Sequence, residues 1–238
     1  MREIIDFHSH ILPGIDDGSR SVEESIALLQ KEAEQGITHV IATPHFYPQH
    51  DTPERFLERR NEAEILLREE MGKYPGLPKV SIGAEVYFFN GISDCDAILP
   101  LTIGKERCIL IEMPMHHWTE KYYCELEDIY RKQGLLPIIA HLDRYLGGFG
   151  TNKILQQLAQ MPVLVQANAE FFLNKHTAGK ALRMLKRDQI HLLGSDCHNL
   201  TDRSPNLKEA IASIEKRLGQ EALEAICHWQ QEALPNTL

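Results

Sequence analysis

The amino-acid sequence predicts an α/β fold, in which short parallel strands form a barrel-like layer beneath covering helices. Apolar runs alternate with helical segments along the chain, and seven of these runs have the length of strands. Such alternation is typical of parallel strands, because each crossover requires a covering segment. The length of 238 residues suits one α/β barrel, which typically has about 250 residues. We therefore expect a single domain over residues 1–238, with an open doubly wound sheet as the alternative.

The expected strands are short apolar runs that end at polar or turn-forming residues. Runs of this length, bounded by glycine and proline, indicate strands that are buried on both faces. The first run ends at His8. The others occupy residues 37–43, 79–84, 108–111, 135–140, 162–166 and 190–194.

The expected helices lie between these runs, and two of them carry clear start signals. Ser21 and Glu24 form a capping box, and Gly36 marks the end of that helix. Thr52 precedes Pro53 at the start of a highly charged helix that runs to about residue 72. Further helices are expected at residues 117–132, 151–160 and 176–188, followed by two more, the first beginning near residue 204.

Composition argues against several classes of protein. The 34 acidic residues outnumber the 25 basic ones, and the net charge of −9 disfavours a general nucleic-acid binder. The five cysteines include no Cys-x-x-Cys pair, which indicates reduced thiols in a cytosolic protein. No apolar run approaches the roughly 20 residues of a membrane span, and no basic-then-apolar leader is visible. We expect a cytoplasmic protein that is not inserted in a membrane.

Polar residues at the strand ends suggest where the chemistry lies. His8 and His10 are two residues apart, so in a strand both imidazoles point to the same face. Alone, this pair would more often be a surface feature than a metal site. Similar residues recur at the ends of later strands, however, and in α/β barrels those ends form the active site. The candidate metal ligands are His8, His10, Asp17, His45, Glu85, Glu112, His141, Asp196 and His198.

These nine candidates are too many for one ion, and they suit two or three divalent ions that share a bridging carboxylate. Imidazole and carboxylate ligands without thiolate favour manganese, iron or zinc. Spacing alone does not separate Asp17 from its neighbour Asp16. Cys197 alternates with Asp196 and His198, so we expect its side chain to point into the core. Structural roles are expected for His39, His50, His116, His117, His176, His191 and His228.

Two arginines follow the candidate ligands at the same mouth. Arg144 comes three residues after His141, and Arg203 comes five residues after His198. The planar guanidinium fork matches phosphate oxygens, which makes both arginines candidate phosphate-binding residues. Local ion pairs with Asp143 and Asp202 are an equally good explanation at this point. Divalent ions together with these arginines would outweigh the ligand carboxylates, so an acidic protein can still hold a cationic pocket.

Taken as a set, these motifs resemble the PHP (polymerase and histidinol phosphatase) superfamily. The opening Asp-Phe-His-Ser-His-Ile-Leu-Pro-Gly-Ile-Asp-Asp-Gly is closest to the bacterial protein-tyrosine phosphatases of the CpsB/YwqE type. The same holds for Ala-Thr-Pro-His45, Gly-Ala-Glu85, Ile-Ala-His141-Leu-Asp-Arg144-Tyr and Gly-Ser-Asp196-Cys-His198. The resemblance implies a distorted (β/α)7 barrel and a metal-dependent phosphoesterase associated with capsule and exopolysaccharide synthesis.

Residue by residue, the resemblance implies three metal ions, with manganese first and iron or zinc as alternatives. Glu85 would bridge the first two ions, and Asp17 rather than Asp16 would be the ligand. Arg144 and Arg203 match the phosphate-binding arginines of the family. The three implied ligand sets are His8, His10, Glu85 and Asp196, then Glu85, Glu112 and His141, then Asp17, His45 and His198.

The implied reaction is hydrolysis of a phosphomonoester by a metal-bridging hydroxide. The resemblance implies a substrate with a phosphotyrosine tail, on a membrane-associated bacterial tyrosine kinase. No cysteine shows the Cys-x5-Arg spacing of thiol-dependent phosphatases, and no general acid is identified. Near the ligands, Phe46, Tyr47, Tyr87 and Phe88 either line a wall for an aromatic substrate or pack the barrel rim.

Other functions remain open at this level. A histidinol phosphatase would share the site and differ in its leaving group. A PHP nuclease is disfavoured by the lack of a basic surface or an extra domain, and an amidohydrolase by Asp196-x-His198 at the last strand end. A metal-bound regulator of polysaccharide assembly without turnover is the alternative from another class.

Overall fold

The computed structural model describes residues 4–147 and 151–235, and its strands are paired in two curved sheets. All the pairings between these strands are parallel. The first sheet contains β1 (Ile5–Ser9), β2 (His39–Ala42) and β4 (Lys79–Ile82). The second contains β3 (His45–Phe46), β5 (Glu85–Tyr87), β6 (Cys108–Glu112), β7 (Leu136–Ile139), β8 (Leu164–Asn168) and β9 (Leu192–Gly194).

The two sheets form one barrel, because two strands of the barrel are each broken into two pieces. Pro44 separates β2 from β3 and lacks the N–H that a strand ladder requires. Gly83 lies between β4 and β5, where a Cβ atom would come within 3.0 Å of Ile103 Cγ1. The hydrogen-bond ladder nevertheless continues, since the Glu85 N–H donates to the Pro44 carbonyl at 3.0 Å.

The barrel closes between its first and last strands. Ser9 forms a parallel bridge with Cys197, and the Asp196 N–H donates to the His8 carbonyl at 2.7 Å. With the broken strands counted once each, seven strand positions surround the barrel. The predicted distorted (β/α)7 barrel is therefore confirmed, and the open-sheet alternative is wrong.

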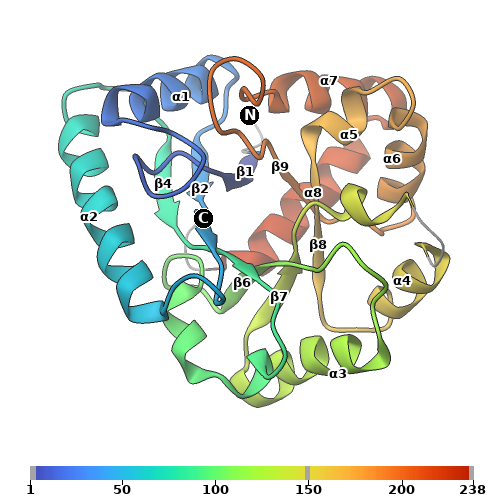
Figure 1. The fold of residues 1–238 in the computed structure, drawn as a ribbon. Helices are drawn as coiled ribbons and strands as arrows, with labels where there is room; N and C mark the ends of the chain where they lie inside the picture. The colour runs from blue at the N-terminus through green and yellow to red at the C-terminus, as the bar shows by residue number, and fades with distance from the viewer. Residues whose placement is uncertain (1–3, 148–150, 236–238) are drawn as a thin grey trace.

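Helices surround the barrel on its outer side, as Figure 1 shows. Two of them begin as the sequence predicts: Ser21 Oγ accepts from the Glu24 N–H at 3.3 Å, and Thr52 Oγ1 accepts from the Arg55 N–H at 3.4 Å. No helix within the described ranges is long and apolar enough to span a membrane. The α-helices are α1 (Val22–Glu34), α2 (Pro53–Met71), α3 (Glu120–Asp128), α4 (Thr151–Leu158), α5 (Ala169–Leu173), α6 (Ala178–Leu185), α7 (Leu207–Leu218) and α8 (Gln220–Ala233).

Apolar side chains fill both the inside of the barrel and the layer beneath the helices. The inner cluster includes Phe7, Ile41 and Leu110, all fully buried. Ala233 and Leu234, at the end of α8, belong to the same inner cluster, so this helix covers the amino-terminal end of the barrel. The opposite, carboxyl-terminal end stays free for polar side chains.

Several predicted boundaries are wrong by a few residues. The helix expected at 117–132 is α3 followed by a π-helical turn at Ile129–Gln133, which Gly134 ends with a φ of 63°. The helix expected at 176–188 is shorter, and α7 begins at Leu207 rather than near residue 204. Short α5 and the 3-10 segments Ile92–Asp94 and Asp96–Leu101 were not predicted, because pieces this short show no clear periodicity.

Candidate metal centre

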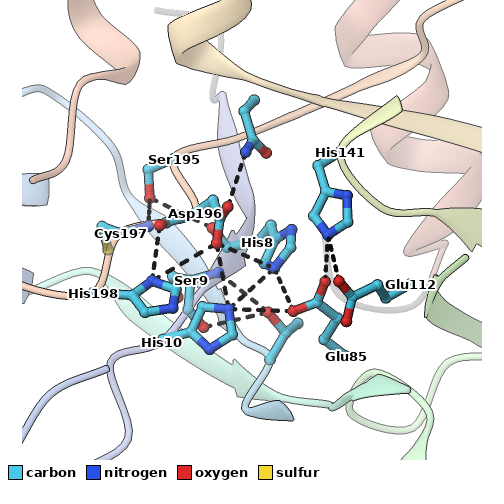
Figure 2. A network of polar contacts seen from close by, with 12 residues as sticks. His8, Ser9, His10, Glu85, Glu112, His141, Ser195, Asp196, Cys197 and His198 are labelled. Atoms are coloured by element: carbon cyan, nitrogen blue, oxygen red, sulfur yellow. Dashed lines mark hydrogen bonds and ion pairs between the residues drawn. The ribbon is translucent and has the colours of Figure 1, made fainter. Parts of the chain in front are cut away.

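All nine candidate ligands meet at the carboxyl-terminal mouth of the barrel. Figure 2 shows most of them converging on one another from separate strands. Their burial is graded: Asp17 is exposed, His45 and Glu112 are partly exposed, and the rest are buried. The buried members are His8, His10, Glu85, His141, Asp196 and His198.

The first group of ligand atoms lies deepest and includes both histidines of β1. The Nε2 atoms of His8 and His10 are 3.1 Å apart. Glu85 Oε2 lies 3.1 Å from His8 Nε2 and 3.4 Å from His10 Nε2. Asp196 Oδ1 lies 3.6 Å from His8 Nε2 and 3.4 Å from His10 Nε2. Four ligand atoms from three strand ends therefore face one point.

Glu85 connects this group to a second one. Its other oxygen, Oε1, lies 2.7 Å from His141 Nε2, which is itself 3.7 Å from Glu112 Oε1. The two oxygens of one carboxylate thus face two sets of ligands. This geometry suits a carboxylate that bridges two cations.

The third group shows which of the two adjacent aspartates, Asp16 or Asp17, faces the other ligands, a choice that sequence spacing left open. Asp17 Oδ1 lies 3.4 Å from both His45 Nε2 and His198 Nε2. Asp16 instead supports the ligands from behind, because its Oδ2 accepts from His10 Nδ1 at 2.7 Å and from the His45 N–H at 3.0 Å. Asp17 therefore presents its carboxylate to the mouth, and Asp16 orients a histidine.

Several buried polar atoms of the cluster have no well-formed hydrogen bond among the described residues. Unpaired buried polar groups typically cost about 1–3 kcal/mol each, so such a concentration requires a reason. Imidazole and carboxylate atoms that converge in this way fit divalent cations. Among the described residues, the buried atoms of the cluster without a well-formed hydrogen bond are His45 Nδ1, Glu85 Oε2, Glu112 Oε2, Asp196 Oδ1 and His198 Nε2, although ion-pair contacts reach several of them, such as Arg203 Nη2 at 2.7 Å from Asp196 Oδ1.

Charge within the cluster agrees with cation binding. Burial alone would raise the pKa of the Glu85 carboxyl, but His8 and the hydrogen bonds from other histidines hold it well below its usual range. The Asp196 carboxyl behaves in the same way, through His8 and His10. Both carboxylates are therefore anionic and available as ligands.

Two of the ligands have a strained backbone. His141 and Asp196 have φ values of 33° and 53°, in the left-handed region that non-glycine residues rarely adopt. Hydrogen bonds hold this conformation: the His141 N–H donates to Gln166 Oε1 at 2.6 Å, and the Asp196 N–H to the His8 carbonyl. The strain turns both side chains into the mouth.

Two supporting residues on β8 were missed by sequence reasoning. Gln166 Oε1 accepts from the His141 N–H and lies 3.2 Å from His8 Nδ1, so one amide links ligands of different groups. Asn168 Nδ2 donates to Asp196 Oδ2 at 2.9 Å. A signal existed, because β8 was the one strand end without an assigned polar residue, and Gln166 and Asn168 alternate there.

The arginines contact the cluster rather than their sequence neighbours. Arg144 Nη2 lies 2.8 Å from Asp196 Oδ2, and Arg203 Nη2 lies 2.7 Å from Asp196 Oδ1. The Asp143 carboxylate accepts from the Asn168 N–H instead. Within the described residues neither expected local ion pair is formed, so that explanation is wrong. Both guanidinium groups remain about one-third exposed at the mouth.

The remaining candidates lie elsewhere. The seven other histidines are outside the cluster, and two of them have clear structural partners: His39 with Ser81 Oγ at 2.9 Å, and His191 with the Val165 N–H at 2.9 Å. The side chain of Cys197 is buried beside Asp6 and Glu32, which confirms that it points away from the mouth.

Comparison with known proteins places this arrangement in a family. The family profile described as capsular polysaccharide synthesis, CpsB/CapC, matches residues 4–234.

The chain belongs to the CpsB/CapC family.

Within this family, the chain is 32% identical over 226 residues to the tyrosine-protein phosphatase CpsB of Streptococcus pneumoniae, with 91% of each protein covered. It is 28% identical to the tyrosine-protein phosphatase YwqE of Bacillus subtilis, over 92% of this chain and 86% of that protein.

Solved structures agree with the fold. A crystal structure from a study of B. subtilis YwqE and S. pneumoniae CpsB, described as unique metal-dependent tyrosine phosphatases, matches with a TM-score of 0.86 and 26% identity. It covers 99% of this chain and 96% of the other. Histidinol phosphate phosphatase from Lactococcus lactis matches at a TM-score of 0.56 and 15% identity, over 92% and 94% of the chains, which shows a shared PHP-type fold only.

Proposed function

We propose that this protein is a metal-dependent protein-tyrosine phosphatase, which hydrolyses a phosphotyrosine ester on another protein. The observation that carries the proposal is Glu85, whose two oxygens face separate sets of ligands, with Arg144 and Arg203 beside them. Family relatives from S. pneumoniae and B. subtilis are named tyrosine-protein phosphatases, which supports this substrate class.

The proposed centre holds three divalent ions, with manganese as the preferred metal and iron or zinc as alternatives. Glu85 would serve as a ligand to the first two ions, and Asp17 to the third. The assignment is supported by the converging atoms and by the buried oxygens and nitrogens that lack a well-formed hydrogen bond among the described residues. The proposed ligands are His8, His10, Asp17, His45, Glu85, Glu112, His141, Asp196 and His198.

When bound, the ions supply a hydroxide of lowered pKa and Lewis-acid stabilisation of the phosphoryl group. Arg144 and Arg203 bind non-bridging phosphoryl oxygens and stabilise the charge that develops in the transition state. Both now contact Asp196, so a bound phosphate would take over contacts that are already oriented towards the mouth. Gln166 and Asn168 keep His8, His141 and Asp196 in position.

The proposed partner is the phosphotyrosine tail of a membrane-associated bacterial tyrosine kinase, reached from the cytoplasm. Its dephosphorylation would regulate capsule or exopolysaccharide synthesis, in line with the description of the family.

The test compares kcat/KM of the manganese-loaded protein on a phosphotyrosyl peptide and on histidinol phosphate. We expect strong preference for the peptide. Preference for histidinol phosphate would overturn the proposed substrate while keeping the site. If the protein with verified bound metal hydrolyses neither compound, the proposal that it is a phosphatase is overturned. An Asp17→Ala variant that loses hydrolysis but keeps the cellular effect would favour a regulatory role.

A further inference from the structure

Two partly exposed tyrosines stand at the rim of the metal centre. Tyr47 follows β3, and Tyr87 ends β5. Their ring centroids are 5.6 Å apart, and the Tyr47 ring stacks on His45 at 5.1 Å with an interplanar angle of 28°. The neighbouring Phe46 and Phe88 are instead buried in the core. The four aromatic residues near the ligands therefore divide into two core residues and two rim residues.

Both tyrosine rings lie directly beside candidate ligands. Tyr87 is the register partner of Glu112 on the adjacent strand. Tyr47 comes two residues after His45, on which its ring stacks. The two rings therefore offer aromatic packing surface next to the centre.

A hollow opens from the centre on the Tyr47 side. It has a volume of about 390 Å³ and is lined by Ile15, Asp17, His45, Tyr47 and His50, among others. This volume is within the roughly 300–1,000 Å³ of small-ligand sites. Asp17 and His45 are themselves candidate ligands, so this hollow adjoins the centre directly.

A second hollow, of about 430 Å³, lies on the other side of the mouth. It is lined by Met115, His116, His117 and Trp118, among others, and it includes Arg144 but none of the nine candidate ligands. The Tyr47 hollow is therefore the better continuation of the site, since two ligand residues form part of its wall.

We propose that the Tyr47 hollow is the subsite for the aromatic ring of the substrate, with Tyr47 as the packing surface and Tyr87 as its support. The inference rests on the proposed function, because it assigns the leaving group of the same reaction. Aromatic rings prefer offset or tilted packing against one another, which a ring fixed on His45 provides.

The depth of the centre adds to this selectivity. Glu85 and Asp196 are almost completely buried, whereas Tyr47 is partly exposed. A phosphotyrosine holds its phosphorus farther from the peptide backbone than a phosphoserine does. A centre set below its rim in this way favours the longer side chain, which can place its phosphate there while its peptide stays outside.

The test measures binding of two phosphonates that cannot be hydrolysed at a P–O–C ester. Calorimetry on the manganese-loaded protein gives Kd for phenylphosphonate and for methylphosphonate. We expect the wild type to prefer the phenyl compound, and Tyr47→Ala to reduce that preference about tenfold. Tyr47→Phe keeps the ring and should restore most of the preference. Tyr87→Ala should cause a smaller loss.

Two control variants locate the subsite. Tyr74→Ala removes an exposed tyrosine beyond the end of α2, and Met115→Ala alters the second hollow; both should keep the wild-type preference. An unchanged preference in both Tyr47→Ala and Tyr87→Ala overturns the inference. Loss of the phenylphosphonate preference in Met115→Ala would also overturn it. The same holds if Tyr47→Ala weakens the binding of methylphosphonate as much as that of phenylphosphonate.

A kinetic measurement separates this inference from the proposed function. In Tyr47→Ala, KM for a phosphotyrosyl peptide should rise in parallel with the phenylphosphonate Kd. If the wild type prefers phenylphosphonate as expected but does not hydrolyse the peptide, the proposed function is overturned and the aromatic subsite stands. If the wild type hydrolyses the peptide and Tyr47→Ala changes neither KM nor the phosphonate preference, the subsite is overturned and the proposed function stands.

Discussion

Two clusters of buried ionisable side chains flank strand β1, and they differ in what can neutralise them. The metal centre lies at the carboxyl-terminal mouth. The second group, which we call the closed cluster, consists of Asp6, Glu32 and Cys197. All three side chains are fully buried. Asp6 and Cys197 are close in sequence to ligands of the centre, yet their side chains meet Glu32 of α1 instead.

The closed cluster brings together two buried carboxyl groups, those of Asp6 and Glu32. Asp6 Oδ1 accepts from the Ser195 N–H at 2.8 Å, and Asp6 Oδ2 accepts from Ser195 Oγ at 2.5 Å. Burial, and then the nearby Asp6 carboxylate, raise the pKa of Glu32 well above its ordinary value. Its environment therefore favours the protonated form of Glu32.

The carboxyl groups of the metal centre behave in the opposite way, because neighbouring histidines hold the pKa of Glu85 and of Asp196 well below the ordinary values. Its ligands come from several strand ends and include imidazoles, which the closed cluster lacks. The comparison teaches that carboxylates alone do not make a metal site. Converging imidazoles, a carboxylate whose two oxygens face separate sets of side chains, and access from solvent distinguish the mouth from the closed cluster.

The largest difference between the two clusters is expected when one carboxylate of each is replaced by an amide. Glu85→Gln should lower kcat/KM about a thousandfold, because it removes the proposed bridge and several kcal/mol of transition-state stabilisation. Glu32→Gln, which resembles the protonated acid, should stay within about twofold of wild type. Steady-state kinetics on a phosphotyrosyl peptide checks both. Equal losses would mean that the closed cluster also serves catalysis.

A smaller effect is expected from the supporting amide of the centre. Gln166→Ala should weaken metal affinity about 10- to 100-fold, because His8 and His141 lose their common partner. Competition with a chelator of known affinity measures this change. Gln160→Ala, at an exposed position, is the matched control. Unchanged affinity in Gln166→Ala, with the fold intact by circular dichroism, would contradict the proposed support.

The closed cluster should instead affect the pH dependence of stability. Since Glu32 has a raised pKa when folded, the unfolded chain loses this proton first as pH rises above about 4.3. The unfolding free energy should then fall, by up to about 1.4 kcal/mol per pH unit, until the folded-state pKa is reached. Glu32→Gln removes this loss.

Thermal unfolding at several pH values measures the effect on metal-free protein. The Tm of Glu32→Gln relative to wild type should increase from pH 5 to pH 8. Glu34→Gln changes an exposed carboxylate on the same helix and should show no such trend. A constant difference between Glu32→Gln and wild type would mean that Glu32 is ionised in the folded protein.

The smallest effect concerns the thiol of the closed cluster. Burial raises the pKa of Cys197 well above its ordinary value, so little reactive thiolate forms. Iodoacetamide should modify the exposed Cys124, leave Cys197 intact and keep phosphatase activity. Mass spectrometry with a parallel assay checks this. Activity that declines together with Cys197 modification would show that the closed cluster opens in the native protein.

Much of the centre could be predicted from sequence, because barrel strands end at one mouth whatever their loops do. His8, His45, Glu85 and His141 needed only the correct strand ends, and boundary errors of a few residues did not remove them from the mouth. Helix lengths and the short elements after β5 and β8 were predicted less well. Their boundaries depend on tertiary packing rather than on local periodicity.

By itself, then, the sequence determined the alternating fold and the residue types that converge at the mouth. The tertiary structure decided which neighbouring side chain faces inward. It separated Asp17 from Asp16, turned Arg144 and Arg203 towards Asp196, and paired Glu32 with Asp6. These choices depend on contacts between segments far apart in the chain, and on left-handed backbone at two strand ends, neither of which hydrophobic periodicity encodes.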